Sequence, residues 1–458
     1  MKTFFVVLAA ASLFGQAKLP QYTKETLPNG TVIAMMPRSG VPLVHLRVLI
    51  KGGVESDPQG MAGLANLTAN LLRRGTSKRS AQQFAEELDY LGGTFQAGFD
   101  GQLGSATAIS SEFLSKDFDK GLDLLADAIL HPAFTESEVH KELARRIDGA
   151  KAVKDNAQAS INSYFRAAFF GRAHPYGNPP DEMSYSQMSR KDIMDLHQKF
   201  YCGRNMLIVV TGEFDPSSAK TKLAQIFGAA PAGTAYAWGT APALVRRGQL
   251  LLIDKPDATQ TYFQIAQPGI DRKNPDRTTL DIINTLFGGR FTSMLNDELR
   301  VNSGLTYGAG SILEQNRLPG AIVISTYTKN DTTTQAIDMA LDVLRRLNEK
   351  GITAEQLASA KAYVKGLYPT SRLETMDQLA ALIGEIELYG LGRDEVDGYF
   401  ARIDNITLDQ ANAIIKKYYK TDDLTFVVLG SADKIREQMK KYDPHGTEVS
   451  IKTSGWGN

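Results

Sequence analysis

Cysteine is nearly absent from this sequence. Cys202 is the only one in 458 residues, so no disulfide can form within the chain. A chain of this length has a large enough core to be stable without such links. Cys202 lies between Tyr201 and Gly203, just before a stretch predicted to be a buried strand. We therefore expect its thiol to pack in the core rather than to react.

An excess of either charge is also missing. Lys+Arg and Asp+Glu number 51 each, and no basic tail or stripe is present. The sequence therefore gives no support for binding to nucleic acid, which needs a basic surface. Hydrophobic residues make up 43% of the chain and charged residues 22%, as in ordinary globular proteins of two to four domains.

No hydrophobic run near the N-terminus is long enough to cross a membrane. The apolar run 4–14 follows Lys2 and is too short for a bilayer core of roughly 30 Å. Gly15 and Ala17 are small residues at the positions expected three and one before a cleavage site. We expect residues 1–17 to be a cleaved signal peptide and the mature chain to be exported, with a bacterial periplasm as its destination. The alternative is a membrane anchor.

What the sequence does contain is an internal repeat. Residues 189–201 and 206–212 match residues 407–419 and 424–430 at a constant offset of 218, without a gap. Each copy starts with a hydroxyl residue suited to cap a helix, continues with apolar residues at helical spacing, and ends in a β-rich run closed by glycine. Two homologous halves follow from this pattern.

We expect an α+β fold in which each half is an α/β-roll, a sheet with helices on one face. The predicted halves are 18–230 and 248–458, and the small, Pro- and Gly-rich stretch 231–247 is the predicted linker. The predicted strands are 31–35, 43–50, 93–99, 104–109, 249–253, 261–266, 306–313 and 321–326. The predicted helices are 60–72, 81–91, 113–130, 136–154 and 275–287.

Several segments together resemble one family of peptidases. They are the glycine-rich frame 52–65, Leu-Leu-Arg-Arg-Gly-Thr at 71–76, and the segments 91–95, 131–134, 171–177 and 287–307. Over nearly all of the mature chain this frame resembles the inverted-zinc-motif peptidases, the insulinase, pitrilysin and mitochondrial processing peptidase family. The resemblance implies two α/β-roll halves that face another such pair across a closed, peptide-digesting chamber.

The zinc motif of that family is degenerate in this chain. In active members the five positions that match 66–70 read His-x-x-Glu-His, with two imidazoles on Zn²⁺ and a Glu that activates water. Here these positions hold Asn66, Ala69 and Asn70. A neutral amide is not among the usual zinc ligands, and an alanine methyl can neither bind metal nor accept a proton.

Other residues do not rebuild a metal site in the sequence. The family's third ligand would fall near residues 147–149, where Asp148 is the one carboxylate and is expected on a solvated helix face. No two of the six histidines are three to five residues apart, as a helical metal pair requires. They are His45, His131, His140, His174, His197 and His445. We expect no metal in this chain, and a structural hydrogen-bonding role for His174.

Two residues of the second half match positions that contact substrate in the resembling family. Arg300 and Tyr307 are seven residues apart, with Gly304 and Leu305 between them. The resemblance implies that both reach a peptide held at the zinc, Arg through its fork of donors and Tyr through its hydroxyl. Alternatively, Arg300 pairs with Glu298 or another surface acid, and Tyr307 packs in a strand.

Two hypotheses of function follow. In the first, the chain is the zinc-less subunit of a heterodimeric zinc peptidase. It is inactive alone, and a homologous partner carries His-x-x-Glu-His and the zinc, while this chain contributes Arg300, Tyr307 and half of the chamber. In the second, it is a non-enzymatic peptide-binding or scaffold protein that retains the fold. An active zinc protease by itself would need ligands that the sequence lacks, and no other catalytic motif is present.

Overall fold

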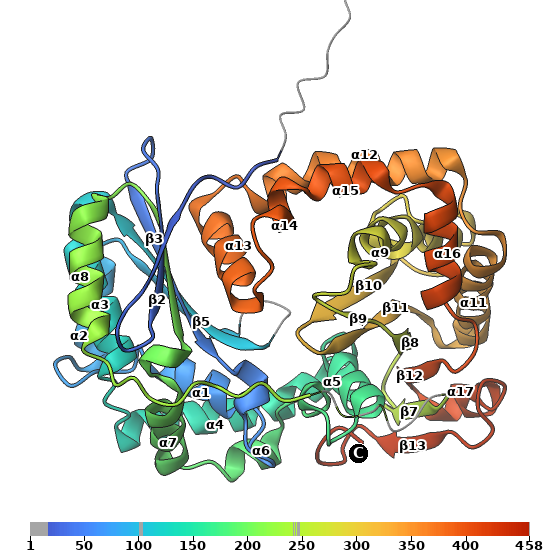
Figure 1. Cartoon of the computed structure of the whole chain (residues 1–458). Coiled ribbons are helices and arrows are strands. Elements are labelled where there is room, and N and C mark those ends of the chain that lie inside the picture. Colours follow the sequence, from blue (N-terminus) through green and yellow to red (C-terminus); the bar gives the residue numbers. More distant parts are fainter. Residues whose placement is uncertain (1–16, 100–103, 241, 243, 245–247, 458) are drawn as a thin grey trace, which may run out of the picture.

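The computed structural model describes residues 17–99, 104–240, 242, 244 and 248–457. The predicted signal peptide lies outside these residues except for Ala17, and so do five positions of the predicted linker. Figure 1 shows two α+β halves side by side, each built around one sheet, which confirms the predicted fold class. No helix in the described part of the chain is both long and apolar enough to span a membrane.

The first sheet has six strands in the order β1-β2-β6-β3-β5-β4. They are β1 (Thr23–Thr26), β2 (Val32–Pro37), β3 (Leu43–Lys51), β4 (Thr94–Phe99), β5 (Ala106–Leu114) and β6 (Met206–Gly212). Among the described pairs of this sheet, β2 and β6 are parallel and the other neighbours are antiparallel. The helix predicted for 113–130 begins later than expected. Phe113 still belongs to β5, which continues to Leu114, and it pairs with Val44 of β3.

The second sheet has seven strands in the order β13-β7-β12-β8-β11-β10-β9. They are β7 (Leu250–Asp254), β8 (Gln260–Pro268), β9 (Ile270–Asp271), β10 (Ala309–Asn316), β11 (Pro319–Lys329), β12 (Thr425–Gly430) and β13 (Thr447–Ser450). Five of them repeat the first sheet, since β7-β12-β8-β11-β10 matches β2-β6-β3-β5-β4 in order. The repeat seen in the sequence therefore extends to the topology.

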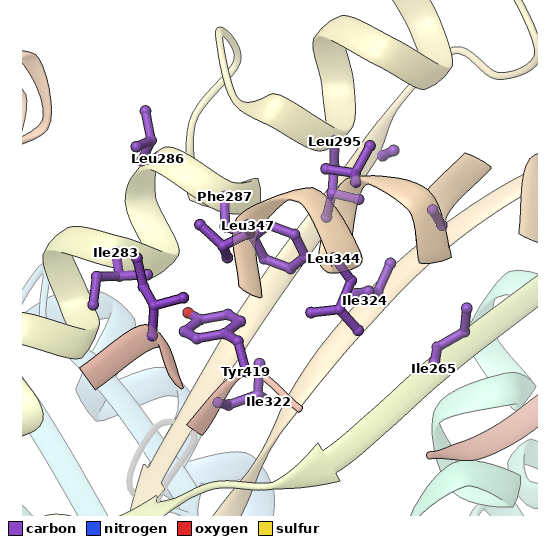
Figure 2. Packing of buried hydrophobic residues seen from close by; sticks show 14 of the residues in the cluster. Ile265, Ile283, Leu286, Phe287, Leu295, Ile322, Ile324, Leu344, Leu347 and Tyr419 are labelled. Carbon is purple, nitrogen blue, oxygen red and sulfur yellow. The ribbon is translucent and has the colours of Figure 1, made fainter. Parts of the chain in front are cut away.

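Helices of each half cover one face of that half's sheet. In the first half they are α1 (Leu64–Leu71), α2 (Ala81–Tyr90), α3 (Phe118–Leu130), α4 (Glu136–Ala152), α6 (Glu182–Ser186), α7 (Arg190–Phe200) and α8 (Pro216–Gly228). In the second half they are α9 (Arg277–Asn284), α10 (Met294–Asn296), α11 (Thr333–Lys350), α12 (Ala354–Arg372), α15 (Tyr399–Asn405), α16 (Leu408–Tyr418) and α17 (Ala432–Met439). The short helix α14 (Asp394–Asp397) differs, because its Val396 packs in the cluster on the first sheet. Figure 2 shows the second core, where Tyr419 packs edge-on against Phe287 with ring centroids 5.3 Å apart.

The repeat also specifies how two equivalent helices begin. Ser189 caps α7 by accepting the backbone N–H of Asp192, and Thr407 caps α16 by accepting that of Gln410. In both cases the third residue of the helix bonds back to the cap, which completes a capping box. The helix starts predicted at these two positions are confirmed.

The other face of each sheet is covered by a helix from the opposite half. Helix α5 (Ala157–Phe170) packs on the second sheet with residues such as Phe165 and Phe170, and α13 (Met376–Tyr389) packs on the first with Leu379 and Ile383. The two helices occupy equivalent places in the repeat. The central strands β6 and β12 are therefore buried on both faces, which explains their unbroken apolar sequences.

An ion pair joins the two halves to the linker. Arg317 donates from Nε to both carboxylate oxygens of Glu55 at 2.9 Å, and from Nη2 to the carbonyl of Gly239 at 2.7 Å. The guanidinium also lies 4.8 Å from the ring centroid of Trp238. Since Glu55 belongs to the first half and Arg317 to the second, this contact fixes both halves and the linker together.

The only cysteine lies beneath the start of the linker. Cys202 is buried, and a Cβ at Gly233 would lie 2.3 Å from its Sγ, so only glycine fits over the thiol. Burial raises the pKa of the Cys202 thiol, which keeps it protonated. The expected packing role is confirmed.

Candidate functional site

Helix α1 carries the degenerate motif, and its first turn is tightly fixed. Gly63 precedes it with a φ of 93°, and a Cβ there would lie 2.9 Å from the hydroxyl of Tyr185. The Asp57 carboxylate accepts the backbone N–H groups of Gly63 and Ala65 at 2.7 Å each. Burial raises the pKa of Asp57 to about 7, although these two N–H groups oppose the shift.

The two asparagines of the motif bond to each other. Asn66 and Asn70 are both half-buried, and Asn70 Nδ2 donates to the main-chain oxygen of Asn66 at 2.8 Å and to its Oδ1 at 3.1 Å. Ala69 is fully buried. Strand β4 runs alongside, since a Cβ at Gly98 would lie 3.4 Å from Asn66 Nδ2. The family's metal positions are thus occupied by a closed amide pair and a methyl group.

This arrangement does not fit zinc. Asn66 could bind a metal only through its side-chain oxygen Oδ1, and this atom already accepts a hydrogen bond from Asn70. Neither amide carries the negative charge of a thiolate or carboxylate ligand. On α4, Ile147 packs toward the core and Asp148 is exposed, as the sequence predicts for that face. In the described part of the chain, no group of three or more His, Cys, Asp or Glu residues could hold a metal ion.

His174 has a structural role in the loop that the family resemblance singles out. It is buried, and its Nδ1 accepts the backbone N–H of Tyr176 at 3.1 Å. Burial lowers the pKa of His174 to about 4. The hydrogen-bonding role expected for it is confirmed.

Arg300 lies in an irregular helical segment. Helix α10 continues as a π-helix over Asp297–Asn302 (η7), and this wider turn includes Arg300. Such π segments occur frequently at functional sites. The guanidinium carbon of Arg300 lies 4.5 Å from the ring centroid of Phe291, within the range of a cation–π contact. Phe291 is itself 68% exposed, so the stacked pair lies at the surface.

Tyr307 has a fixed backbone and an open side chain. Thr326 Oγ1 donates to the carbonyl of Gly308 at 2.8 Å, and Thr328 Oγ1 donates to that of Leu305 at 2.7 Å, so β11 holds the chain on both sides of Tyr307. The Tyr307 side chain is nevertheless 81% exposed. A large aromatic residue held in this way presents its hydroxyl to whatever approaches this surface.

The structure disagrees with the alternative assignment of these two residues. Glu298 pairs with Arg346 at 3.3 Å rather than with Arg300, and the Arg300 side chain makes no ion pair with any residue in the described ranges. Tyr307 precedes β10 and does not pack in it. The sequence reasoning missed Phe291, although its position in the family-like segment 287–307 could have indicated it.

Comparison with known families gives two matches that together cover most of the chain. The family model described as "Insulinase (Peptidase family M16)" matches residues 33–179. The model described as "Peptidase M16 inactive domain" matches residues 187–364. The first contains the degenerate motif on α1, and the second contains Arg300 and Tyr307.

Individual proteins show the same similarity over nearly their full length. An uncharacterized zinc protease of Mycobacterium tuberculosis is 25% identical over 404 residues, which are 86% of this chain and 90% of that protein. One of Bacillus subtilis is 23% identical over 402 residues, with 87% and 95% covered. Among solved structures, a peptidase M16 inactive domain from Pseudomonas fluorescens superposes with a TM-score of 0.83 at 22% identity, covering 90% of this chain and 98% of that one. A protease from Helicobacter pylori gives 0.80 at 19% identity, covering 90% and 100%. These two structures support the fold.

Proposed function

Because the chain belongs to peptidase family M16, the insulinase family, but has lost the donors of its zinc motif, we propose that it is the non-metal subunit of a two-subunit zinc peptidase. In this proposal a homologous partner carries the intact His-x-x-Glu-His and the zinc. This chain contributes half of the peptide chamber and the side chains of Arg300 and Tyr307, and it does not hydrolyse peptides alone.

The main support is the contrast between the two candidate positions. On α1 the polar groups of Asn66 and Asn70 bond to each other, and Ala69 is buried. In the second half Tyr307 is exposed on a backbone held by β11, and the half-buried side chain of Arg300 stacks on the exposed ring of Phe291. Loss of metal-binding residues together with retention of substrate-facing ones is what a division of labour between two subunits requires.

The chemistry assigned to this chain is binding and charge stabilisation. The Arg300 guanidinium offers several N–H donors to the carbonyl oxygens of an extended peptide. The Tyr307 hydroxyl can donate to the oxygen that becomes negative in the tetrahedral intermediate of peptide hydrolysis. The Phe291 ring holds the guanidinium from one side, so Arg300 loses little freedom when a peptide binds.

We also propose that the chain acts after export. This proposal rests on the charged start, the short apolar run and the small residues Gly15 and Ala17, which form the pattern of a signal peptide.

Affinity capture of the tagged mature chain from its native cells, with mass spectrometry and metal analysis, tests the proposed division. We expect the captured complex to contain a homologous chain with an intact zinc motif and about one zinc per heterodimer, and the isolated chain to contain none. Stoichiometric zinc in the isolated chain would overturn the proposal. Failure to capture any zinc-bearing homologue would favour the non-enzymatic peptide-binding alternative.

A further inference from the structure

One buried amide connects the segment before Arg300 with the segment after Tyr307. Asn296 is the last residue of α10, immediately before the π-helix η7, and it is 4% exposed. Its Nδ2 donates to the carbonyl of Phe291 at 2.7 Å, and its Oδ1 accepts the backbone N–H of Ala309 at 3.2 Å. Both ends of the amide are therefore used, each on a different segment of the chain.

Backbone bonds fix where the Arg300 side chain begins but not where its guanidinium lies. The carbonyl of Leu299 accepts the backbone N–H groups of Leu305 at 3.0 Å and Thr306 at 3.3 Å, so the chain returns directly from η7 to Tyr307. A long arginine side chain still has several rotatable bonds. The direction of the guanidinium must therefore come from another contact.

The Phe291 ring supplies that contact. The ring centroid lies 4.5 Å from the guanidinium carbon of the half-buried Arg300. Phe291 is itself 68% exposed, so few neighbours hold the ring, and its place depends on the backbone from which it projects. The bond from Asn296 to the Phe291 carbonyl fixes that backbone.

The other end of the amide bonds to the strand that follows Tyr307. Ala309 is the first residue of β10, and it pairs with Thr326 of β11. The hydroxyl of Thr326 also donates to the carbonyl of Gly308 at 2.8 Å. Strand β11 thus holds this segment from one side, and Asn296 holds it from α10.

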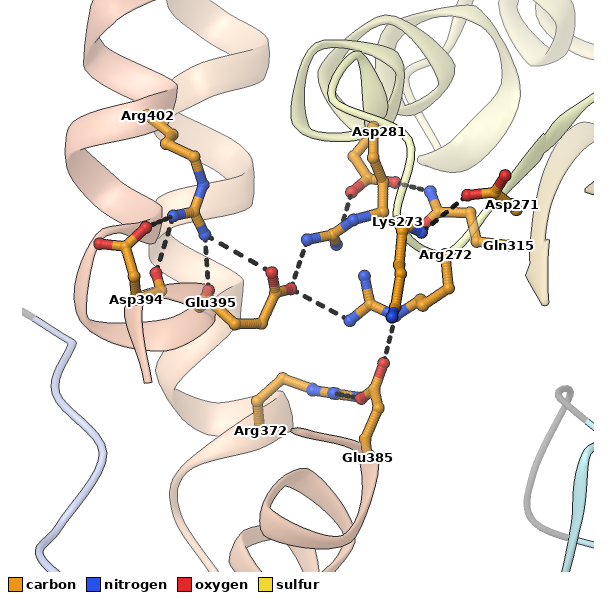
Figure 3. A network of polar contacts seen from close by, with 11 residues as sticks. Asp271, Arg272, Lys273, Asp281, Gln315, Arg372, Glu385, Asp394, Glu395 and Arg402 are labelled. Carbon is orange, nitrogen blue, oxygen red and sulfur yellow. Dashed lines mark hydrogen bonds and ion pairs between the residues drawn. The ribbon is translucent and has the colours of Figure 1, made fainter. Parts of the chain in front are cut away.

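The far end of β10 is anchored as well. Gln315 of β10 donates to Asp281 of α9, and Arg272 bridges Glu385 and Glu395 in the same polar network (Figure 3). A strand that is bonded at both ends is a fixed reference. Asn296 therefore sets the place of α10 and of the Phe291 ring relative to Tyr307.

We propose that Asn296 is a positioning residue of the peptide site, which holds the Phe291 ring against the Arg300 guanidinium at a fixed place relative to Tyr307. A peptide needs both donors at one spacing, and a misplacement of about 1 Å can cost on the order of 10²-fold in rate. The proposal rests on the proposed function in taking Arg300 and Tyr307 as the groups that bind the peptide.

Fluorine NMR of the full mature chain tests the positioning without a partner. 4-Fluorophenylalanine placed at position 291 gives one resonance, and Arg300→Ala should shift it because the stacked cation is lost. Asn296→Leu keeps the size of the side chain but removes both hydrogen bonds. It should move the resonance by at least about half of the Arg300→Ala shift, and Arg300→Ala should then have little further effect. An unchanged resonance in Asn296→Leu would overturn the proposal.

Asn205→Leu is the matched control. Asn205 is a fully buried amide of the first half that donates to the carbonyl of Thr234 at 3.2 Å and accepts the backbone N–H of Tyr236 at 2.6 Å. Its loss should lower stability in urea as the loss of Asn296 does, but it should leave the resonance unchanged. Two results would show a merely structural role and overturn the proposal: a control that moves the resonance as far, or an Asn296→Leu chain that fails to fold while the control folds.

Peptide hydrolysis by the complex with the zinc-bearing partner gives a second readout. Asn296→Leu should lower kcat/KM about tenfold or more, and it should add little to the loss caused by Arg300→Ala with Tyr307→Phe, because the three residues act as a unit. Asn205→Leu should leave the rate unchanged. If Arg300→Ala with Tyr307→Phe lowers the rate and Asn296→Leu does not, the positioning role alone fails. If neither lowers it, the proposed function fails, and the fluorine resonance still decides whether Asn296 places the Phe291 ring.

Discussion

Single residues divide into those whose polar groups are bonded inside the chain and those whose polar groups are open. Asn66 and Asn70 bond to each other on α1. The buried ring nitrogens of His45 have no hydrogen-bond partner in the part of the chain that the structure describes, and Glu112 Oε2 lies 3.9 Å from its Nδ1. The Tyr307 side chain, by contrast, is open to the surface, and the half-buried Arg300 stacks on the exposed Phe291 ring. This contrast separates structural from functional candidates.

Buried histidines make the stability of the fold sensitive to acid. Burial lowers the pKa of His45, His174 and His197 to about 4. The unfolded chain, with histidine pKa values near 6.5, therefore binds more protons between these limits, and stability falls as the pH falls from 6.5 toward 4. Each group can contribute up to about 3 kcal/mol to this loss.

His45→Leu tests this account, because the variant cannot take up the proton. We expect the variant to gain about 2 kcal/mol over the natural chain when the pH is lowered from 7.5 to 5, measured by urea unfolding. His140→Gln is the control, since His140 lies exposed on α4. An equal loss of stability in the natural chain and the His45 variant would contradict the prediction.

At the scale of elements, the two exchanged helices hold the halves together. Helix α13 lies on the first sheet, where Thr211 Oγ1 donates to the carbonyl of Met376 at 2.9 Å. Helix α5 lies on the second sheet, where Gln264 Nε2 donates to Asn162 Oδ1 at 2.6 Å. Close approach of α13 depends on Gly384, because a Cβ there would lie 2.9 Å from Leu49 Cδ1.

Gly384→Leu should therefore destabilise the protein. The added side chain would meet a fully buried leucine, and such overpacking costs about 1–3 kcal/mol or more. Gly366→Leu on α12 is the matched control, because no atom lies within 4 Å of a Cβ at that position. It should stabilise the protein by about 0.5–1 kcal/mol through helix propensity. Thermal unfolding of both variants measures the difference, and equal melting temperatures would show that α13 does not pack as described.

Part of this structure could be predicted from the sequence because the relevant signals are local. Helix caps at Ser189 and Thr407, and apolar runs such as β6 and β12, act over neighbouring residues. The covering of each sheet by the other half's helix could not be predicted in this way. Helix α13 is buried almost all round, so no polar stripe indicates which surface it contacts.

The same limit applies to the sites. The motif on α1 and the pair Arg300 and Tyr307 are visible as short patterns in one stretch of sequence. The contact between Arg272 and Glu385 joins residues more than a hundred positions apart, and no periodicity connects them. The stacking of Arg300 on Phe291 depends on the π-helix η7, which changes the direction of side chains relative to an α-helix.

At the scale of the whole molecule, the two repeated halves have diverged in their chemistry. The first half keeps the frame of the family's zinc site without its donors, and the second carries Arg300 and the exposed Tyr307, which we propose bind a peptide. The ion pair between Glu55 and Arg317 and the exchanged helices join these halves into one unit. A partner chain would then complete the peptidase that we propose.

The rate of peptide hydrolysis by the complex of this chain with its zinc-bearing partner tests the central claim most directly. The account predicts that Arg300→Ala with Tyr307→Phe lowers kcat/KM by about 10²-fold or more, since one lost oxyanion donor typically costs about 10²–10³. Zinc content and subunit ratio should not change. Arg345→Ala with Tyr90→Phe, which alters an exposed arginine and tyrosine elsewhere, should have no effect. An unchanged rate in the Arg300 and Tyr307 variant would contradict the account.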